Sequence, residues 1–175
     1  MKKIVLIFLL LLFGIMSFAQ GLQELERNPS FKGITIGMSI SEISNKLRYE
    51  KTVNGYSIYK VIDTNYYSVF NVRLNYVRVV ALSGIVHAIE AMKIVKATKE
   101  QATVFDPAEL DIIQAGLTRL YGEPKYALNE ENSKFVRLGA QWISKTKLAN
   151  CFIDFYGTFV GYKLQFSLCE HKEDF

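Results

Sequence analysis

The stretch at residues 106–124, DPAELDIIQAGLTRLYGEP, decides how the rest of the chain is organised. Asp106 can cap a helix, Pro107 suits the first helical position, and Glu109 favours the positive N-terminal end of a helix. Leucine and isoleucine then recur at helical spacing as far as Gly122, a residue that commonly ends helices. The stretch therefore predicts one amphipathic helix that separates two runs of strand-like sequence.

A second, shorter helix is expected at residues 39–48. Ser39 and Glu42 have the spacing of a capping box, in which each side chain accepts a hydrogen bond from the other residue's backbone N–H. An Asn54-Gly55 hairpin turn and alternating apolar residues predict strands between the two helices. Strand-like runs are expected at residues 31–36, 49–53, 56–62, 70–76, 85–95, 135–144, 150–156 and 162–168, a β-bulge at 77–79, and a polar loop around 130–131.

The order of these elements predicts the fold class. A parallel α/β fold needs strands that alternate with helices, and that pattern is absent, whereas consecutive strands favour an antiparallel sheet. We expect an α+β domain with an antiparallel sheet of about seven strands and two helices packed on one face. The repeated order of a helix followed by a meander also suggests a degenerate internal duplication, although no residue-level repeat supports it.

The first twenty residues, MKKIVLIFLLLLFGIMSFAQ, have the basic head, apolar run and small residues of a secretory signal peptide. We expect cleavage between Ala19 and Gln20, because Ser17 and Ala19 put small residues three and one positions before this bond. The apolar run is also short for a membrane-spanning helix. The mature protein is then expected to be soluble and periplasmic or secreted, without stable membrane insertion. The expected divisions are a signal peptide at residues 1–19, a flexible lead at 20–30, a single domain at 31–170 and a tail at 171–175.

Charge and cysteine content narrow the classes of partner. The formal net charge is +4, and loss of Lys2 and Lys3 with the signal peptide lowers it to about +2. No block of lysine and arginine is present, so nucleic-acid binding is not expected. Cys151 and Cys169 could form a disulfide in an oxidising compartment, or could be two separately buried thiols. No cofactor or metal site is expected.

Two segments resemble a loose set of small exported bacterial proteins. In FKGITIGMSISEI, at residues 31–43, a Gly-x-Ser segment opens a short helix. In LTRLYGEP, at residues 117–124, a helix ends in Tyr-Gly-x-Pro before a strand that carries Trp142. The helix-then-meander unit is similar to that of BamE-like outer-membrane assembly proteins and of β-lactamase-inhibitor-like repeats. This resemblance implies a non-catalytic protein that contacts other proteins, although the chain lacks the lipobox Cys of BamE-like lipoproteins and no functional residue is carried over.

Few residues suggest catalysis. His87, Glu90 and Asp154 each interrupt an apolar run in an expected strand. A hydrolase of envelope material would need these side chains to converge in a cleft with shifted pKa values. The simpler interpretation places them on the solvated face of antiparallel strands.

Tyrosines crowd the first meander, and they are the feature that most suggests binding. Tyrosine offers a large, rigid contact area with a polar tip, which suits protein interfaces and could also stack on sugars, although it also fills half-buried sheets. The candidate binding residues are Tyr56, Tyr59, Tyr66, Tyr67, Arg73 and Arg78. We expect an exported, non-catalytic protein that binds another envelope protein, with an envelope hydrolase and a small-ligand carrier as alternatives.

Overall fold

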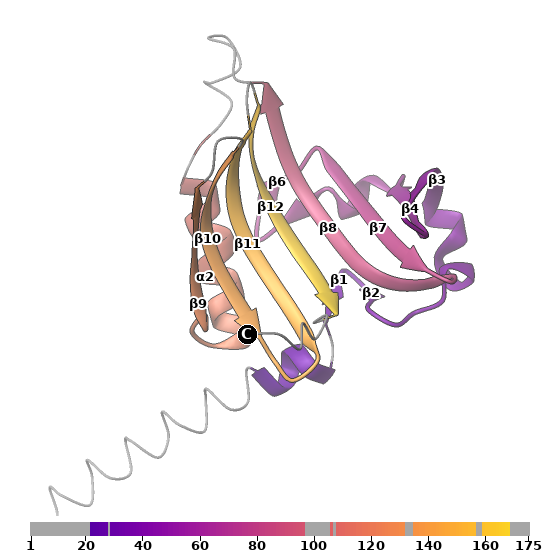
Figure 1. Cartoon of the computed structure of the whole chain (residues 1–175), viewed down its shortest axis with the longest axis horizontal. Helices are drawn as coiled ribbons and strands as arrows, with labels where there is room; N and C mark the ends of the chain where they lie inside the picture. The colour runs from indigo at the N-terminus through magenta and orange to yellow at the C-terminus, as the bar shows by residue number, and fades with distance from the viewer. Residues whose placement is uncertain are drawn as a thin grey trace, which may run out of the picture.

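The computed structural model of the chain describes residues 22–27, 29–96, 106, 108–131, 135–156 and 159–168. Its main feature is an eight-stranded antiparallel sheet in the order β3-β4-β7-β8-β12-β11-β10-β9 (Figure 1). The strands are β3 (Leu47–Val53), β4 (Tyr56–Val61), β7 (Tyr76–Leu82), β8 (Ile85–Lys96), β9 (Tyr126–Glu131), β10 (Phe135–Ile143), β11 (Lys147–Tyr156) and β12 (Phe159–Leu168). The α+β class is confirmed, with one strand more than the approximate number expected.

The sheet consists of two meanders. The first contains β3, β4, β7 and β8 and follows the helix η1 (Ile40–Lys46), and the second contains β9 to β12 and follows α2 (Ala108–Tyr121). The meanders join where β8 and β12 pair antiparallel, with Ala91 opposite Leu164. The first strand of each meander, β3 or β9, is therefore an edge of the sheet.

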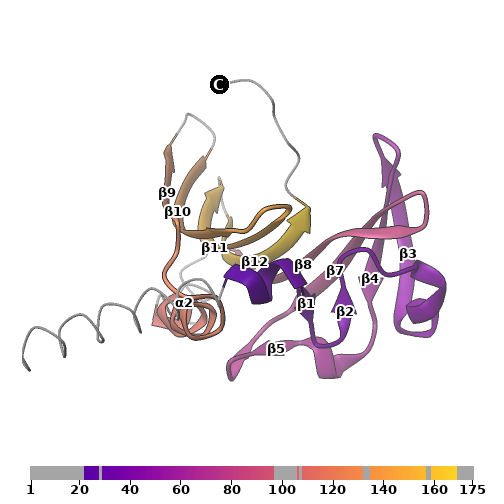
Figure 2. The same cartoon turned by 90° about the horizontal axis from the view of Figure 1, so that it is seen from below.

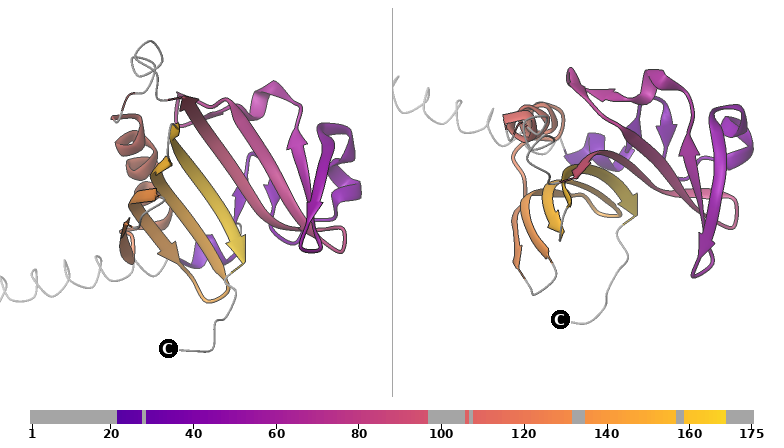
Figure 3. Two further views of the ribbon diagram at one scale, coloured as in Figure 1. Left: turned by 45° about the horizontal axis from the view of Figure 1, so that its top comes forward. Right: turned by 90° about the horizontal axis from the view of Figure 1, so that it is seen from above.

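One face of the sheet carries the core. The helix α2, the helix at residues 22–27, and two small hairpins lie on this side (Figure 2). The hairpins pair β1 (Ser30–Phe31) with β2 (Ile34–Thr35) and β5 (Ser68–Val69) with β6 (Val72–Arg73). The core is one continuous cluster that includes Val79, Ile89, Ile113, Leu117, Trp142 and Leu164. The β3–β4 and β9–β10 hairpins, at the two ends of the sheet, project away from α2 (Figures 2 and 3).

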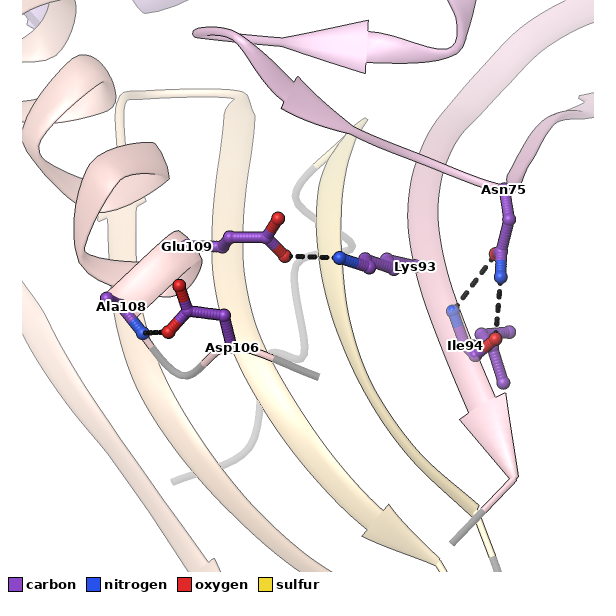
Figure 4. A network of polar contacts seen from close by, with 6 residues as sticks. All are labelled: Asn75, Lys93, Ile94, Asp106, Ala108 and Glu109. Atoms are coloured by element: carbon purple, nitrogen blue, oxygen red, sulfur yellow. Dashed lines mark hydrogen bonds and ion pairs between the residues drawn. The ribbon is translucent and has the colours of Figure 1, made fainter. Parts of the chain in front are cut away.

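The capping predictions are confirmed at both helices. Ser39 and Glu42 form the capping box of η1, and the Asp106 carboxylate accepts a hydrogen bond from Ala108 N at 2.9 Å (Figure 4). Gly122, with φ at +78°, follows the end of α2. The first helix nevertheless differs from the expected 39–48, because it is a 3-10 helix and its predicted last residues belong to β3.

Two polar contacts tie the end of β8 to its surroundings (Figure 4). Lys93 Nζ lies 2.6 Å from Glu109 Oε2 on α2. The Asn75 amide donates to the carbonyl oxygen of Ile94 at 2.6 Å and accepts from its N–H at 3.0 Å. Asn75 therefore continues the hydrogen bonding of the sheet beyond the start of β7.

The expected strand at residues 70–76 is wrong. Phe70 and Asn71 have φ values of +47° and +68° and form the turn between β5 and β6. Positive φ is rare for a bulky residue and needs compensation from packing. The Phe70 ring supplies it by packing against α2 at Gly116, where a Cβ atom would lie 2.5 Å from the ring.

Two further expectations within the sheet are corrected. Residues 126–131 form the edge strand β9, although the acidic residues 130–131 were expected in a loop. The edge strand β9 forms because its backbone pairs with β10, its one neighbour in the sheet. The sequence of residues 126–131 alone gives little indication of this pairing. The bulge lies between Val80 and Ala81, where His87 is the extra residue on β8, rather than at 77–79.

The expectation of a flexible lead at residues 20–30 is wrong for the part that the structure describes. Residues 22–27 are helical, and Leu25 is fully buried. The Glu26 carboxylate accepts hydrogen bonds from Ser144 Oγ at 2.6 Å and from Thr146 N at 2.8 Å, in the turn between β10 and β11. The expected signal peptide with its cleavage site between Ala19 and Gln20, and the tail at 171–175, lie outside the described residues.

Candidate functional site

The candidate site is the sheet face opposite the core, which we call the open face. Side chains alternate between the two faces of a strand, so the core positions Val79, Ile89 and Leu164 place their neighbours on the open face. Among the described elements, no helix or strand lies over this face (Figures 2 and 3). The open face is therefore where the described part of the fold can offer a broad surface to another molecule.

A buried carboxylate lies at the centre of the open face. Glu90 is 5% exposed and forms ion pairs with Arg78 Nε on β7 and, at 2.7 Å, with Lys163 Nζ on β12. Burial alone would raise the pKa of Glu90, but the positive charges of Lys163 and Arg78 and their hydrogen bonds outweigh burial and lower the pKa. This ion cluster fastens the first meander to the second across the β8–β12 junction.

A buried aromatic ring extends this centre toward β10. Phe152 is 2% exposed, although it lies on the open face. The guanidinium carbon of Arg137 lies 4.2 Å from the centre of the ring, and Lys163 Nζ lies 5.7 Å from it. Gly139, opposite Phe152, leaves the required space, because a Cβ atom there would lie 2.6 Å from the Phe152 Cβ.

One end of the open face carries exposed apolar side chains, which we call the apolar patch: Val53, Tyr56, Leu82 and Ile85. The register pairs Tyr56 with both Val53 and Leu82, and Leu82 with Ile85, so the four side chains share one face. Val53, Leu82 and Ile85 are 42%, 40% and 45% exposed, and Tyr56 is half-buried. The ring of His87, at the bulge, lies 5.3 Å from that of Tyr56.

Three basic residues lie on the same face of the β3–β4 hairpin as the apolar patch. Arg48, Lys51 and Lys60 share the open face through their register on β3 and β4, and Lys60 Nζ lies 5.5 Å from the centre of the Tyr76 ring. The Tyr76 hydroxyl donates to Glu50, and burial followed by this carboxylate raises the pKa of Tyr76 to about 12. Glu50 is the one acidic residue of β3, β4 and β7.

Charge is distributed unevenly between the two ends of the open face. The strands of the second meander bring Arg137 and Lys163 to this face. Lys163 is paired there with Glu90, and Arg137 lies over the Phe152 ring. Among the described side chains, the excess of positive charge on the open face therefore lies on β3 and β4, the hairpin that also contributes to the apolar patch.

The six candidate binding residues are not brought together. Tyr56 and Arg78 lie on the open face, whereas Tyr59 packs edge-on against Tyr49 on the other face, with ring centres 5.7 Å apart. The other three candidate residues, Tyr66, Tyr67 and Arg73, lie outside the eight-stranded sheet. Tyr66 is 5% exposed and accepts a hydrogen bond from Lys46 Nζ at 2.8 Å, Tyr67 donates to the Val61 carbonyl oxygen at 2.7 Å, and Arg73 is exposed on β6.

The three residues of the hydrolase alternative share the open face only in part. His87 and Glu90 both lie there on β8, and the backbone of Asp154 pairs with Arg137 and Gly161. A general acid at neutral pH requires a carboxyl group with a raised pKa, whereas the pKa of Glu90 is lowered. Glu90 is thus held as a structural anion between two cations.

The cysteines are described only in part. Cys151 is buried in the core, and burial raises the pKa of its thiol. Its neighbours across the sheet are Ala140 and Leu164, and the last residue of β12, Leu168, pairs with Lys147. Cys169, the other half of the possible disulfide, lies outside the described residues.

Within the described ranges, no cluster of three or more His, Cys, Asp or Glu side chains is placed to hold a metal ion. No helix in the same ranges is both long and apolar enough to cross a membrane. Comparison of the chain with family models, curated proteins and solved structures finds no match.

Proposed function

We propose that the chain is an exported, non-catalytic binding protein of the bacterial envelope, and that it docks another envelope protein on the open face. The observation that carries this proposal is the apolar patch, where Val53, Leu82 and Ile85 are each at least 40% exposed beside Tyr56. Exposed apolar side chains that lie together, rimmed by polar residues, are typical of protein interaction sites. The signal-peptide pattern of the first twenty residues and the resemblance to helix-then-meander proteins support the same proposal.

The charges beside the patch define the chemistry of the partner. Arg48, Lys51 and Lys60 lie on the same face as the patch, and the acidic Glu50 already accepts a hydrogen bond from Tyr76. Complementary charge accelerates association and selects among partners. The partner is therefore expected to present an apolar side chain or two flanked by aspartate and glutamate.

The partner can be identified by photo-crosslinking from position 82 in intact cells and then purified for titration calorimetry. Leu82→Glu places a charge in the apolar patch, and we expect it to weaken binding of that partner at least tenfold, about 1.4 kcal/mol. Ile112→Glu is the matched control, because Ile112 is 49% exposed on α2 and Leu82 is 40% exposed on the open face. Equal affinities of the two variants would refute docking at the patch.

Salt dependence and the mature N-terminus test the other two parts of the proposal. Binding should weaken as the salt concentration rises, and Lys60→Ala should reduce that dependence, because charge steering is screened by salt. N-terminal sequencing of the protein exported by cells should begin at Gln20. A mature chain that begins at Met1 would refute export by signal cleavage.

A further inference from the structure

A hollow lies on the side of the fold that carries the β5–β6 hairpin, away from the open face. It has a volume of about 660 Å³ and is lined by Thr64, Asn65, Tyr67, Ser68, Asn71, Arg73, Leu74 and Asn75. Ligand sites in proteins commonly have volumes of about 300–1,000 Å³. None of the eight lining residues is acidic, and seven of them carry an amide, a hydroxyl or a guanidinium group.

Two basic residues lie at this hollow: Arg73 lines it, and Lys32, which is not a lining residue, donates to two residues that do. Lys32 Nζ lies 2.9 Å from Ser68 Oγ and donates to the backbone oxygen of Asn65. Arg73 is the partner of Ser68 across the β5–β6 hairpin, a pairing that places the Cβ atoms about 5 Å apart. No acidic side chain among the described residues pairs with Lys32 or Arg73. Two adjacent cations without a neutralising acid attract an anion.

The remaining groups of the wall suggest more than an isolated anion. The side chains of Thr64, Asn65 and Asn71 are exposed, and each carries a donor and an acceptor that can bind a hydroxyl group. The Tyr67 hydroxyl is fixed by its hydrogen bond to the Val61 carbonyl oxygen. The hollow therefore combines the positive charge of Arg73 in its wall, and that of Lys32 beside it, with neutral groups that bind hydroxyls.

The hollow is preformed by contacts that do not involve a ligand. Asn75 is held by its two hydrogen bonds to the backbone of Ile94 (Figure 4). The turn at Phe70 is fixed by the packing of its ring on Gly116 of α2. Leu74 N donates to the Tyr67 carbonyl oxygen at 3.0 Å, which closes the hairpin. Binding here requires little ordering of the protein, which favours affinity.

We infer that this hollow binds an acidic sugar, with Arg73 in the wall and Lys32 beside it on the sugar carboxylate, and the amide and hydroxyl side chains on its hydroxyl groups. This inference does not depend on the proposed function, because the hollow and the apolar patch share no residue. It would give the protein a contact to acidic polysaccharide in addition to a protein partner.

The test is an NMR titration of the purified chain with glucuronate, glucose and acetate at low salt. Glucuronate should give saturable shifts of the backbone amides of Asn65 and Asn71, and it should bind at least tenfold more tightly than either glucose or acetate. Arg73→Ala and Lys32→Ala should each weaken glucuronate binding about tenfold, whereas Arg119→Ala, an exposed position on α2, should leave it unchanged.

Each alternative result has a defined meaning. Acetate that binds as tightly as glucuronate would overturn the sugar assignment, since only the charge would then be recognised. Glucuronate affinity that is the same in Arg73→Ala and Arg119→Ala would overturn the site itself. Tryptophan fluorescence of Trp142, the one tryptophan of the chain and fully buried, shows whether each variant is folded before it is titrated.

Discussion

The contact of Glu26 with the β10–β11 turn predicts how the stability of the fold depends on pH. Its carboxylate accepts hydrogen bonds from the Ser144 hydroxyl and from both the hydroxyl and the N–H of Thr146. The hydrogen bonds from the Ser144 and Thr146 side chains are the main cause of a pKa of Glu26 near 2, lowered from an ordinary value of 4.5. The helix at residues 22–27 is therefore held most strongly when Glu26 is ionised.

The magnitude follows from the size of this shift. A lowering of the Glu26 pKa from 4.5 to about 2 corresponds to at most ~3 kcal/mol, at ~1.36 kcal/mol for each pH unit. Glu26 is only half-buried, so water screens the interaction. We expect Glu26→Gln, which keeps the shape but replaces one acceptor oxygen with a donor, to lower the free energy of unfolding by ~1–2 kcal/mol at pH 7.

The pH dependence gives a sharper test than the size alone. Because the folded-state pKa is below the unfolded-state pKa, the stabilisation is complete above about pH 4.5 and is lost as the pH falls toward 2. Urea unfolding, followed by the fluorescence of the buried Trp142, measures the free energy at each pH. Glu24→Gln, on the exposed side of the same helix, is the control. The reasoning would be refuted if the Glu26→Gln and Glu24→Gln variants had the same free energy of unfolding at pH 7. It would also be refuted if the difference in free energy between Glu26→Gln and the unmodified protein were as large at pH 2 as at pH 7.

Three other substitutions have expected outcomes that differ in kind. Glu90→Gln should lower the free energy of unfolding by ~1–3 kcal/mol at pH 7. This is less than for a fully buried ion pair, because the two cationic partners of Glu90 are partly exposed. The loss should shrink below about pH 4, since the pKa of Glu90 is lowered in the folded state. Gly116→Ala usually stabilises a helix, but here it should lower the free energy of unfolding in urea by ~1–3 kcal/mol. The reason is that the new Cβ atom would lie 2.5 Å from the Phe70 ring. Asn75→Ala should accelerate hydrogen exchange at the Ile94 N–H by about tenfold, and an unchanged rate would show that the amide does not protect it.

The parts of the fold that sequence reasoning predicted correctly are those that local chemistry determines. A capping box requires only Ser39 and Glu42 at the correct spacing, and Gly122 ends α2 through its own positive φ. The Asn54-Gly55 turn likewise depends on two adjacent residues with positive φ. These signals place the helices and most of the strands, and with them the α+β class.

The incorrect parts depend on residues far apart in the chain. Phe70 adopts a positive φ because of Gly116, which lies on a different element. The helix at residues 22–27 is ordered by Leu25 in the core and by Glu26 on a turn about 120 residues later. Residues 126–131 become a strand because β10 offers them a pairing partner. No local pattern in any of these stretches reports such a contact.

The candidate site depends on the one extra residue of the bulge in β8, His87, which the alternation of apolar residues in the sequence does not reveal. In a regular strand, Ile85 would share a face with Ile89, and Val86 would share the opposite face with Glu90. The bulge at His87 changes this relation: Val86 pairs with Ala81 and lies in the core with Ile89, whereas Ile85 pairs with Leu82 on the open face. The same extra residue thus buries Val86 and places Ile85 on the face that carries Glu90. The apolar patch and the ion cluster share a surface because β8 is irregular at this point, so a pattern that assumes regular alternation separates them.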